Sequence, residues 1–129
     1  MLFVDLDRFK AVNDGMGHDI GDLLLQQVAQ RIASCVREGD LVARLGGDEF
    51  VVLVEGPDDS HRMADKVLAV LRPDYVLGAH VVSVTASIGV SRYPQDGSEL
   101  SELLSAADSA MYRAKTAGRD GVQFYARPQ

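Results

Sequence analysis

The sequence predicts an α+β fold, in which helices pack on a largely antiparallel sheet. Short apolar runs typical of strands stand at the two ends of the chain and in its middle, and longer stretches with apolar residues at helical spacing separate them. A glycine pair, Gly46 and Gly47, joins two of these runs, which indicates a hairpin. The predicted order is therefore strand, helix, hairpin, helix, strand, helix and strand.

Composition places the chain among ordinary globular proteins. Its 129 residues, of which 47% are hydrophobic, are enough for one domain over residues 1–129 with its own core. The net charge of −6 argues against nucleic acid or an anionic membrane surface as the main partner, although local cations and a metal ion can still hold a nucleotide. No apolar run reaches the length of a membrane span. The single cysteine excludes an intrachain disulfide and fits a reducing compartment, the cytoplasm.

The first third of the chain contains a strand and two helices. Residues 1–4 form an apolar strand that ends at Asp5, and a short helical segment is expected at 8–13. A turn is expected at 14–17, before a long helix with Asp19 as its N-cap. The core stripe of this helix consists of Ile20, Leu24, Val28, Ile32 and Val36. Cys35 lies beside the stripe and is expected to be a small core residue.

The hairpin and a third helix occupy the middle of the chain. Residues 41–45 and 50–54 form the two hairpin strands, and the continuous apolar run of the second strand predicts burial on both faces. Residues 57–60 break the chain and cap the next helix. The apolar stripe of that helix consists of Met63, Ala64, Val67, Leu68 and Leu71.

The last third adds a strand, a long helix and a final strand. Alternating apolar residues predict a strand from Val82 to Val90. Ser98 is the expected N-cap of a long helix that ends at Gly118, and residues 122–125 form the last strand.

Acidic residues mark two of the predicted strand ends. Asp5 ends the first strand, with Asp7 on the same face, and Asp48 and Glu49 lie at the hairpin tip. Side by side, these carboxylates would form a hard-oxygen site suited to Mg²⁺, and two such ions could stabilise both oxygens of a phosphoryl transfer. Asp48 and Glu49 point to opposite faces and so have different roles. The alternative is that all of them are simply solvated loop carboxylates.

Asn13, His18 and Asp22 form a second polar group after the first strand. An amide and a carboxylate can pair with the edge of guanine, which offers an N1–H and an exocyclic amine, whereas adenine lacks that pair. Asp22 also fits the first turn of a helix, and the two interpretations are compatible. For His18 the simpler interpretation is a turn residue rather than a metal ligand.

Cations lie near both polar groups. Lys10 is one helical turn beyond the first strand, and Lys115 and Arg119 stand at the end of the last helix. They can hold a triphosphate, although the residues alone favour a helix-dipole role. Arg37 and Asp40, spaced i, i+3 before the hairpin, would by themselves be an exposed ion pair worth ~0–1 kcal/mol.

Taken together, these motifs resemble the GGDEF family of diguanylate cyclases. The resemblance rests on segments that follow the family's order along the whole chain: Asp5–Lys10, Asn13–Asp14 with Gly17–Asp22, Arg44–Phe50, Ser87–Val90, and Ala107–Lys115 with Gly118–Arg119. Their combination is far more specific than any one of them. It implies a palm-type, nucleotidyl-cyclase-like fold with a ferredoxin-like βαββαβ core and a hairpin that carries the Gly46–Phe50 signature.

The resemblance also implies roles at the carboxylate site. Asp5 and Asp48 would be side-chain metal ligands, and Leu6 would contribute its backbone carbonyl. Glu49 would assist deprotonation of the attacking 3′-hydroxyl or bind a second metal, so Asp48 and Glu49 would be the catalytic residues. The cofactor would be Mg²⁺ or Mn²⁺, with two ions in each active site.

For the substrate, the resemblance implies that Asn13 and Asp22 read guanine, with His18 in the same pocket. The phosphates would be held by three cations, Lys10, Lys115 and Arg119. The helix-dipole interpretation of these residues therefore no longer leads. The other substrate contacts would come from Arg8, Phe9, Gly46 and Gly47.

The implied reaction joins two GTP molecules into cyclic di-GMP and releases two pyrophosphates. Each domain would hold one GTP, so a two-fold homodimer would complete the active site. Arg37 and Asp40 match the family's R-x-x-D inhibitory site, at the expected offset before the hairpin. This match implies feedback inhibition by cyclic di-GMP.

Two departures from the family pattern concern the surroundings of this domain. A D-x-L-T segment with an N-R pair normally precedes the first strand, so we expect an N-terminally truncated domain whose first strand is incompletely covered. A sensor domain normally stands upstream, so the chain would be the cytoplasmic part of a larger sensor protein. Without these parts, we expect dimerisation to be weak.

Two other functions stay open. A non-catalytic module that binds GTP or cyclic di-GMP would normally lack the intact signature, which disfavours it. A nucleotidyl cyclase or polymerase-like enzyme on the same fold would use another substrate, and Asp22 is the main argument against it.

Overall fold

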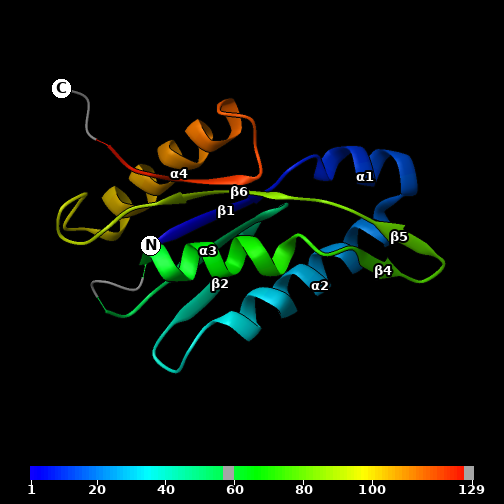
Figure 1. The fold of residues 1–129 in the computed structure, drawn as a ribbon, viewed down its shortest axis with the longest axis horizontal. Coiled ribbons are helices and arrows are strands. Elements are labelled where there is room, and N and C mark those ends of the chain that lie inside the picture. The colour runs from blue at the N-terminus through cyan, green and yellow to red at the C-terminus, as the bar shows by residue number, and fades with distance from the viewer. Residues whose placement is uncertain (57–59, 127–129) are drawn as a thin grey trace.

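The chain folds around a central sheet with helices on both faces. A computed structural model describes residues 1–56 and 60–126. Helix α4 (Leu100–Thr116) lies against one face of the sheet, whereas α2 (His18–Cys35) and α3 (Ser60–Leu71) cover the other (Figure 1). The predicted α+β class is confirmed.

Within the described residues, the central sheet has five strands in the order β2-β3-β1-β6-β7. Neighbouring strands are antiparallel except β6 and β7, which are parallel because α4 connects them as a crossover. Strand β1 is central, so residues at its end can meet segments that are far away in the sequence. The strands are β1 (Leu2–Leu6), β2 (Leu41–Gly46), β3 (Glu49–Leu53), β6 (Ala86–Val90) and β7 (Gly121–Phe124).

The boundary between the first two helices differs from the sequence prediction. Residues 14–16, predicted as part of a turn, belong to α1 (Phe9–Met16), and Gly17 alone separates α1 from α2. Gly17 has a φ of 94° and its N–H bonds to the Asn13 carbonyl, so one residue with positive φ ends α1 and caps α2. Asp19 therefore lies in the first turn of α2 and is not its N-cap.

Helix α4 also starts differently from the prediction. Its N-cap is Glu99 and not Ser98, because Glu99 and Glu102 form a reciprocal capping box. The Glu102 carboxylate accepts the Glu99 N–H at 3.1 Å, so two N–H groups are satisfied where a serine cap would satisfy one. Before α3, the predicted breaker residues 57–59 lie outside the described residues. None of the described helices combines the length and the apolar character needed to cross a bilayer.

A small hairpin, β4 (Tyr75–Leu77) with β5 (His80–Val82), was not predicted. The strand predicted from Val82 to Val90 is wrong in its first part, because the chain leaves regular structure at 83–85 before β6 begins. At the end of this irregular stretch, the Thr85 carbonyl accepts the Asp7 N–H at 2.9 Å, and the Thr85 hydroxyl donates to the Asp7 carboxylate.

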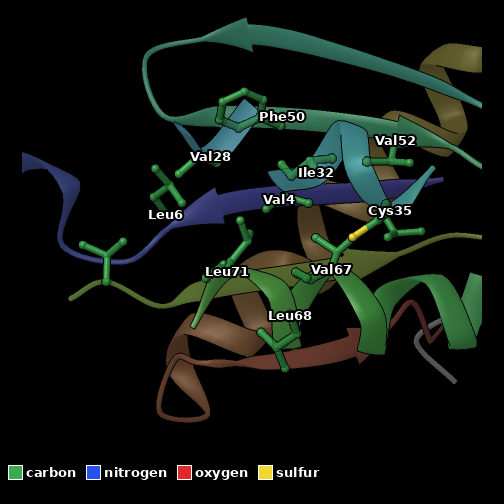
Figure 2. Packing of buried hydrophobic residues seen from close by; sticks show 14 of the residues in the cluster. Val4, Leu6, Val28, Ile32, Cys35, Phe50, Val52, Val67, Leu68 and Leu71 are labelled. Carbon is green, nitrogen blue, oxygen red and sulfur yellow. The ribbon is translucent and has the colours of Figure 1, made fainter. Parts of the chain in front are cut away.

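Two apolar clusters hold the layers together. The larger one lies between the sheet and helices α2 and α3, where side chains of β1 and β3 meet those of both helices (Figure 2). Cys35 is 2% exposed within it, as expected of a core residue. The smaller cluster lies under α4 and contains Phe3, Val51 and Met111.

Candidate active site

The end of β1 and the tip of the β2–β3 hairpin lie side by side. Asp5 faces Glu49 directly across the β1–β3 pair, and the Leu6 N–H bonds to the Asp48 carbonyl at 3.3 Å. At the tip, Gly46 and Gly47 have φ values of 157° and 51°, which glycine adopts more readily than other residues. The predicted adjacency of the two strand ends is therefore confirmed.

The carboxylates of Asp5 and Asp48 meet where the end of β1 lies against the hairpin tip, a place called the carboxylate corner below. Burial, the charge of Asp48 and a hydrogen bond with its side chain raise the pKa of Asp5 to about 7. The Lys115 ammonium, 3.8 Å from the Asp5 carboxylate, acts in the opposite direction. Burial also raises the pKa of Glu49, together with the charges of Asp48 and Asp108. The corner therefore carries excess negative charge that a cation would offset.

The donor set at this corner fits a hard divalent cation. Carboxylate and backbone carbonyl oxygens are the ligands that Mg²⁺ and Mn²⁺ prefer. Among the residues that the structure describes, no three Asp, Glu, His or Cys side chains converge as a metal site. The side-chain donors here are thus the Asp5 and Asp48 pair, and a backbone oxygen such as that of Leu6 would have to complete the set.

Asp7 is used differently from Asp5, although it lies only two residues further on, just after the end of β1. Its carboxylate is only 2% exposed and accepts hydrogen bonds from the hydroxyls of Thr85 and Ser87, each at 2.7 Å. It also accepts the Lys115 ammonium at 3.1 Å and the Asp120 backbone N–H at 3.0 Å. Burial alone would raise the pKa of Asp7, but these donors hold it below its ordinary value.

A cavity of about 280 Å³ opens beside Asp7. Arg8 lines it from the β1–α1 turn and Arg119 from the turn after α4, and both residues have a φ near 60°, at 62° and 63°. Lys115 reaches the same region through its bond to Asp7, whereas Lys10 is exposed on α1. The structure thus brings two of the three cations expected at the phosphates, Lys115 and Arg119, close to Asp7 and leaves Lys10 apart on the surface. Arg8, expected to contribute only its backbone, lies beside them.

The residues expected to read guanine are arranged around the α1–α2 junction. The Asn13 amide and the His18 ring nitrogen Nδ1 are 3.0 Å apart. A Cβ at Gly21 would collide with the Asn13 side-chain oxygen and come within 3.3 Å of the Phe9 ring, so a larger residue here would displace the Asn13 side chain. Asp22 lines a separate hollow of about 370 Å³ with Arg44 of β2.

The family model "Diguanylate cyclase, GGDEF domain" matches residues 1–121, which is nearly the whole chain. The chain belongs to the GGDEF family of diguanylate cyclases. Its Gly46–Phe50 signature forms the hairpin tip that faces Asp5. The expected family and palm-type domain are confirmed.

Three proteins of Pseudomonas aeruginosa are among those that resemble the chain. MucR, a bifunctional diguanylate cyclase and cyclic di-GMP phosphodiesterase, is 50% identical over 127 residues, which cover 97% of this chain and 18% of MucR. NbdA, a cyclic di-GMP phosphodiesterase, is 42% identical and the match covers 98% of this chain and 16% of NbdA. The crystal structure of the TpbB GGDEF domain is 41% identical, with a TM-score of 0.94, over 98% of this chain and 81% of that chain. The chain thus spans less than a fifth of the length of MucR and NbdA.

The pair expected at the GGDEF inhibitory site lies at the opposite end of β2 from the signature. Asp40 is not the exposed partner that the spacing alone indicated, because its side chain is 1% exposed. It accepts the backbone N–H groups of Arg37 and Glu55, each at 2.9 Å, and these bonds hold its pKa below the ordinary value. The Arg37 side chain is 53% exposed, 3.6 Å from Asp40.

Sequence reasoning missed the network around Asp7. Thr85, Ser87 and Asp120 converge on this carboxylate, but they stand 78 to 113 residues away along the chain. The available signal was the spacing of Asp5 and Asp7, which places both on one face of a strand. It indicated the face of Asp7 without indicating its partners.

Proposed function

We propose that this GGDEF domain is a diguanylate cyclase that condenses two GTP molecules into cyclic di-GMP. The observation that carries the proposal is the contact between Asp5 and Asp48, which joins the end of β1 to an intact signature hairpin. Each 3′-oxygen forms a bond to the α-phosphorus of the other nucleotide, the bond to pyrophosphate breaks, and the hydroxyl proton leaves. Two condensations release two pyrophosphates.

At the carboxylate corner, Asp5, Asp48 and the Leu6 carbonyl would hold Mg²⁺ or Mn²⁺, with Glu49 available to a second ion. The bound ions would supply positive charge at the phosphate oxygens. Glu49 is the candidate to accept the proton of the 3′-hydroxyl, because its raised pKa makes its carboxylate a stronger base than an ordinary glutamate.

The nucleotide would lie across the edge where β1, α1 and α4 meet. Asn13 and Asp22 are the candidates to bind guanine, with His18 orienting the Asn13 amide. The triphosphate would lie in the cavity lined by Arg8 and Arg119. The remaining contacts would come from the Phe9 backbone, Gly46, Gly47, Lys10 and Lys115.

One domain offers one such edge, so we propose that a two-fold homodimer brings two bound nucleotides together. Cyclic di-GMP would bind at Arg37 and Asp40 and inhibit the enzyme. Asp40 would hold this loop in place through its bonds to backbone N–H groups, and the exposed Arg37 side chain would contact the ligand. The chain would work in the cytoplasm as part of a larger sensor protein.

The direct test incubates the purified chain with GTP and Mg²⁺ and measures cyclic di-GMP, with the chain alone and fused to a dimeric coiled coil. We expect product from the fusion, none from its Asp48→Asn variant, and none when ATP replaces GTP. Full activity of Asp48→Asn would contradict the metal assignment, and product from ATP would favour a cyclase of another specificity. An Arg37→Ala fusion should lose product inhibition.

A second candidate function is a regulatory module that binds GTP or cyclic di-GMP without making the product. NbdA, which is 42% identical to this chain, carries a phosphodiesterase name without a cyclase name. The same assay separates the two functions. A dimeric fusion that binds GTP but forms no cyclic di-GMP would establish the regulatory module and contradict the cyclase.

A further inference from the structure

Asp7 holds together the segments that surround the proposed phosphate cavity. The turn after β1 carries Asp7, and four other segments reach its carboxylate. They are the segment before β6 through Thr85, β6 through Ser87, the end of α4 through Lys115 and the turn after α4 through the Asp120 N–H. The Asp7 N–H adds a bond to the Thr85 carbonyl at 2.9 Å. Asp7 itself, the segment before β6 and the turn after α4 also line the cavity of about 280 Å³ beside it.

The turn after α4 needs such an anchor. Arg119 and Asp120 are consecutive non-glycine residues with positive φ, at 63° and 44°, a conformation that costs free energy for side chains with a Cβ. The Asp120 N–H is fixed by the Asp7 carboxylate, and the Arg119 N–H by the Ala114 carbonyl at 3.0 Å. The direction of the Arg119 side chain therefore depends on Asp7.

Asp7 is not free to act as a ligand or a proton carrier. One of its oxygens accepts Ser87 and Lys115, and the other accepts Thr85 and the Asp120 N–H. A carboxylate that accepts this many donors is satisfied and fixed in position. Its remaining effect on a bound nucleotide is to set where Lys115 and Arg119 stand.

We propose that Asp7 is a positioning residue that sets Lys115 and Arg119 for the β- and γ-phosphates of the nucleotide. The inference rests on the proposed function, because it takes the bound molecule to be a nucleoside triphosphate. Under this proposal, Asp7 affects how tightly the phosphates are bound, whereas the binding of guanine depends on the α1–α2 junction.

The test compares GTP with GMP, which share guanosine but differ in the phosphates that Lys115 and Arg119 would hold. Binding to the full chain is measured by calorimetry with Mg²⁺ for wild type and Asp7→Asn. We expect Asp7→Asn to weaken GTP binding by about tenfold or more, since a charge-assisted contact is lost, and to leave GMP binding unchanged. The control is Asp65→Asn, which makes the same change at an exposed carboxylate of α3 and should alter neither the GTP affinity nor the GMP affinity.

Equal weakening of GTP and GMP, or no change in either, would overturn the proposal. If Asp7→Asn does not fold, the GTP and GMP affinities of Thr85→Val decide instead. This variant keeps the shape of the Thr85 side chain but removes one donor to Asp7. It should lower the affinity for GTP and leave the affinity for GMP unchanged. In the dimeric fusion, Asp7→Asn should raise KM for GTP by a larger factor than it lowers kcat. A wild-type fusion without cyclase activity would refute the proposed function, but the GTP and GMP affinities would still test Asp7.

Discussion

At the scale of single residues, the candidate site is built from side chains whose neighbours limit what they can do. Asp5 near the end of β1 and Asp7 just after it are two positions apart, yet one faces Asp48 and the other faces four donors. The pKa of Asp5 is raised to about 7 and that of Asp7 is lowered. Removing the negative charge of Asp5 should therefore stabilise the fold, whereas removing that of Asp7 should destabilise it.

Replacing Asp5 tests the charge repulsion at the carboxylate corner. In metal-free buffer at pH 8, Asp5→Asn should stabilise the fold by roughly 1–3 kcal/mol, because it removes one of two partly buried negative charges. Thermal unfolding with a chelator measures this, and millimolar Mg²⁺ should raise the midpoint of wild type but not that of the variant. A variant less stable than wild type without metal would mean that Asp5 and Asp48 do not repel each other.

Gly21 tests the arrangement of the proposed guanine side. Gly21→Ala places a methyl group against the Asn13 side chain, so we expect GTP affinity to fall while the free energy of unfolding changes little, since alanine favours the helix. Fluorescence titration with a labelled GTP measures the affinity. Gly15→Ala on α1 is the matched control, because a Cβ there meets nothing within 4 Å. If both variants bind GTP like wild type, Asn13 is not held by its contact with Gly21.

At the scale of elements, periodicity was enough to locate the long helices and the central strands, and particular contacts decided the rest. Strands β4 and β5 have three residues each, too few for an alternating pattern to emerge. Helix α2 is capped by Gly17 through its positive φ, and α4 is capped by Glu99 through a capping box. The nearby Asp19 and Ser98 are also residue types that favour N-caps, so the sequence alone does not decide between the candidates. The partners of Asp7 come from distant segments, which no local pattern reveals.

The contact between α4 and β6 depends on the absence of a side chain. A Cβ at Gly89 would collide with the Ala107 carbonyl and the Met111 backbone of α4. We expect Gly89→Ala to destabilise the fold by about 3 kcal/mol or more, because a helix backbone would have to move. Urea unfolding measures this against Gly121→Ala in β7, where the nearest atom to a Cβ is 3.6 Å away. Equal stabilities of the two variants would show that α4 can shift without cost.

The loop between α2 and β2 should respond to acid through Asp40. Its folded-state pKa is lowered by the backbone N–H groups of Arg37 and Glu55, so its stabilisation is present above the unfolded pKa, about 3.9, and is lost as pH falls through the lower folded pKa. Asp40→Asn should cost about 1–2 kcal/mol at pH 7 and less at pH 3. Unfolding by urea at both pH values measures the difference, with the exposed Glu38→Gln as control. A cost that does not depend on pH would contradict the charged role of Asp40.

At the scale of the whole molecule, stability is unevenly distributed. Strands β1, β3 and β6 are packed between two helical layers, whereas Val76 and Val81 of the small hairpin are 64% and 63% exposed. Gln27 of α2 donates to the Val76 carbonyl of this hairpin at 2.8 Å, and Arg31 of α2 donates to the Asp74 carbonyl just before it. The hairpin lies beside the end of the molecule that holds α1 (Figure 1).

Amide hydrogen exchange should follow this distribution. We expect the amides of β1 and β6 to exchange only through global unfolding and those of β4 and β5 to exchange faster by local opening, since they bury less apolar surface. Nuclear magnetic resonance measures each amide. If β4 and β5 exchange as slowly as β1, the two sheets unfold as one unit.

The network around Asp7 also has a consequence for biosynthesis. Its partners stand 78, 80, 108 and 113 residues further along the chain, so a ribosome has translated almost the entire domain before the last of them appears. The hairpin that carries the signature emerges much earlier. A nascent chain that ends before residue 115 would display the signature without the lysine, the arginine or the turn that flank the cavity. The ability to capture a nucleotide would thus arise at the end of translation, together with the final strand.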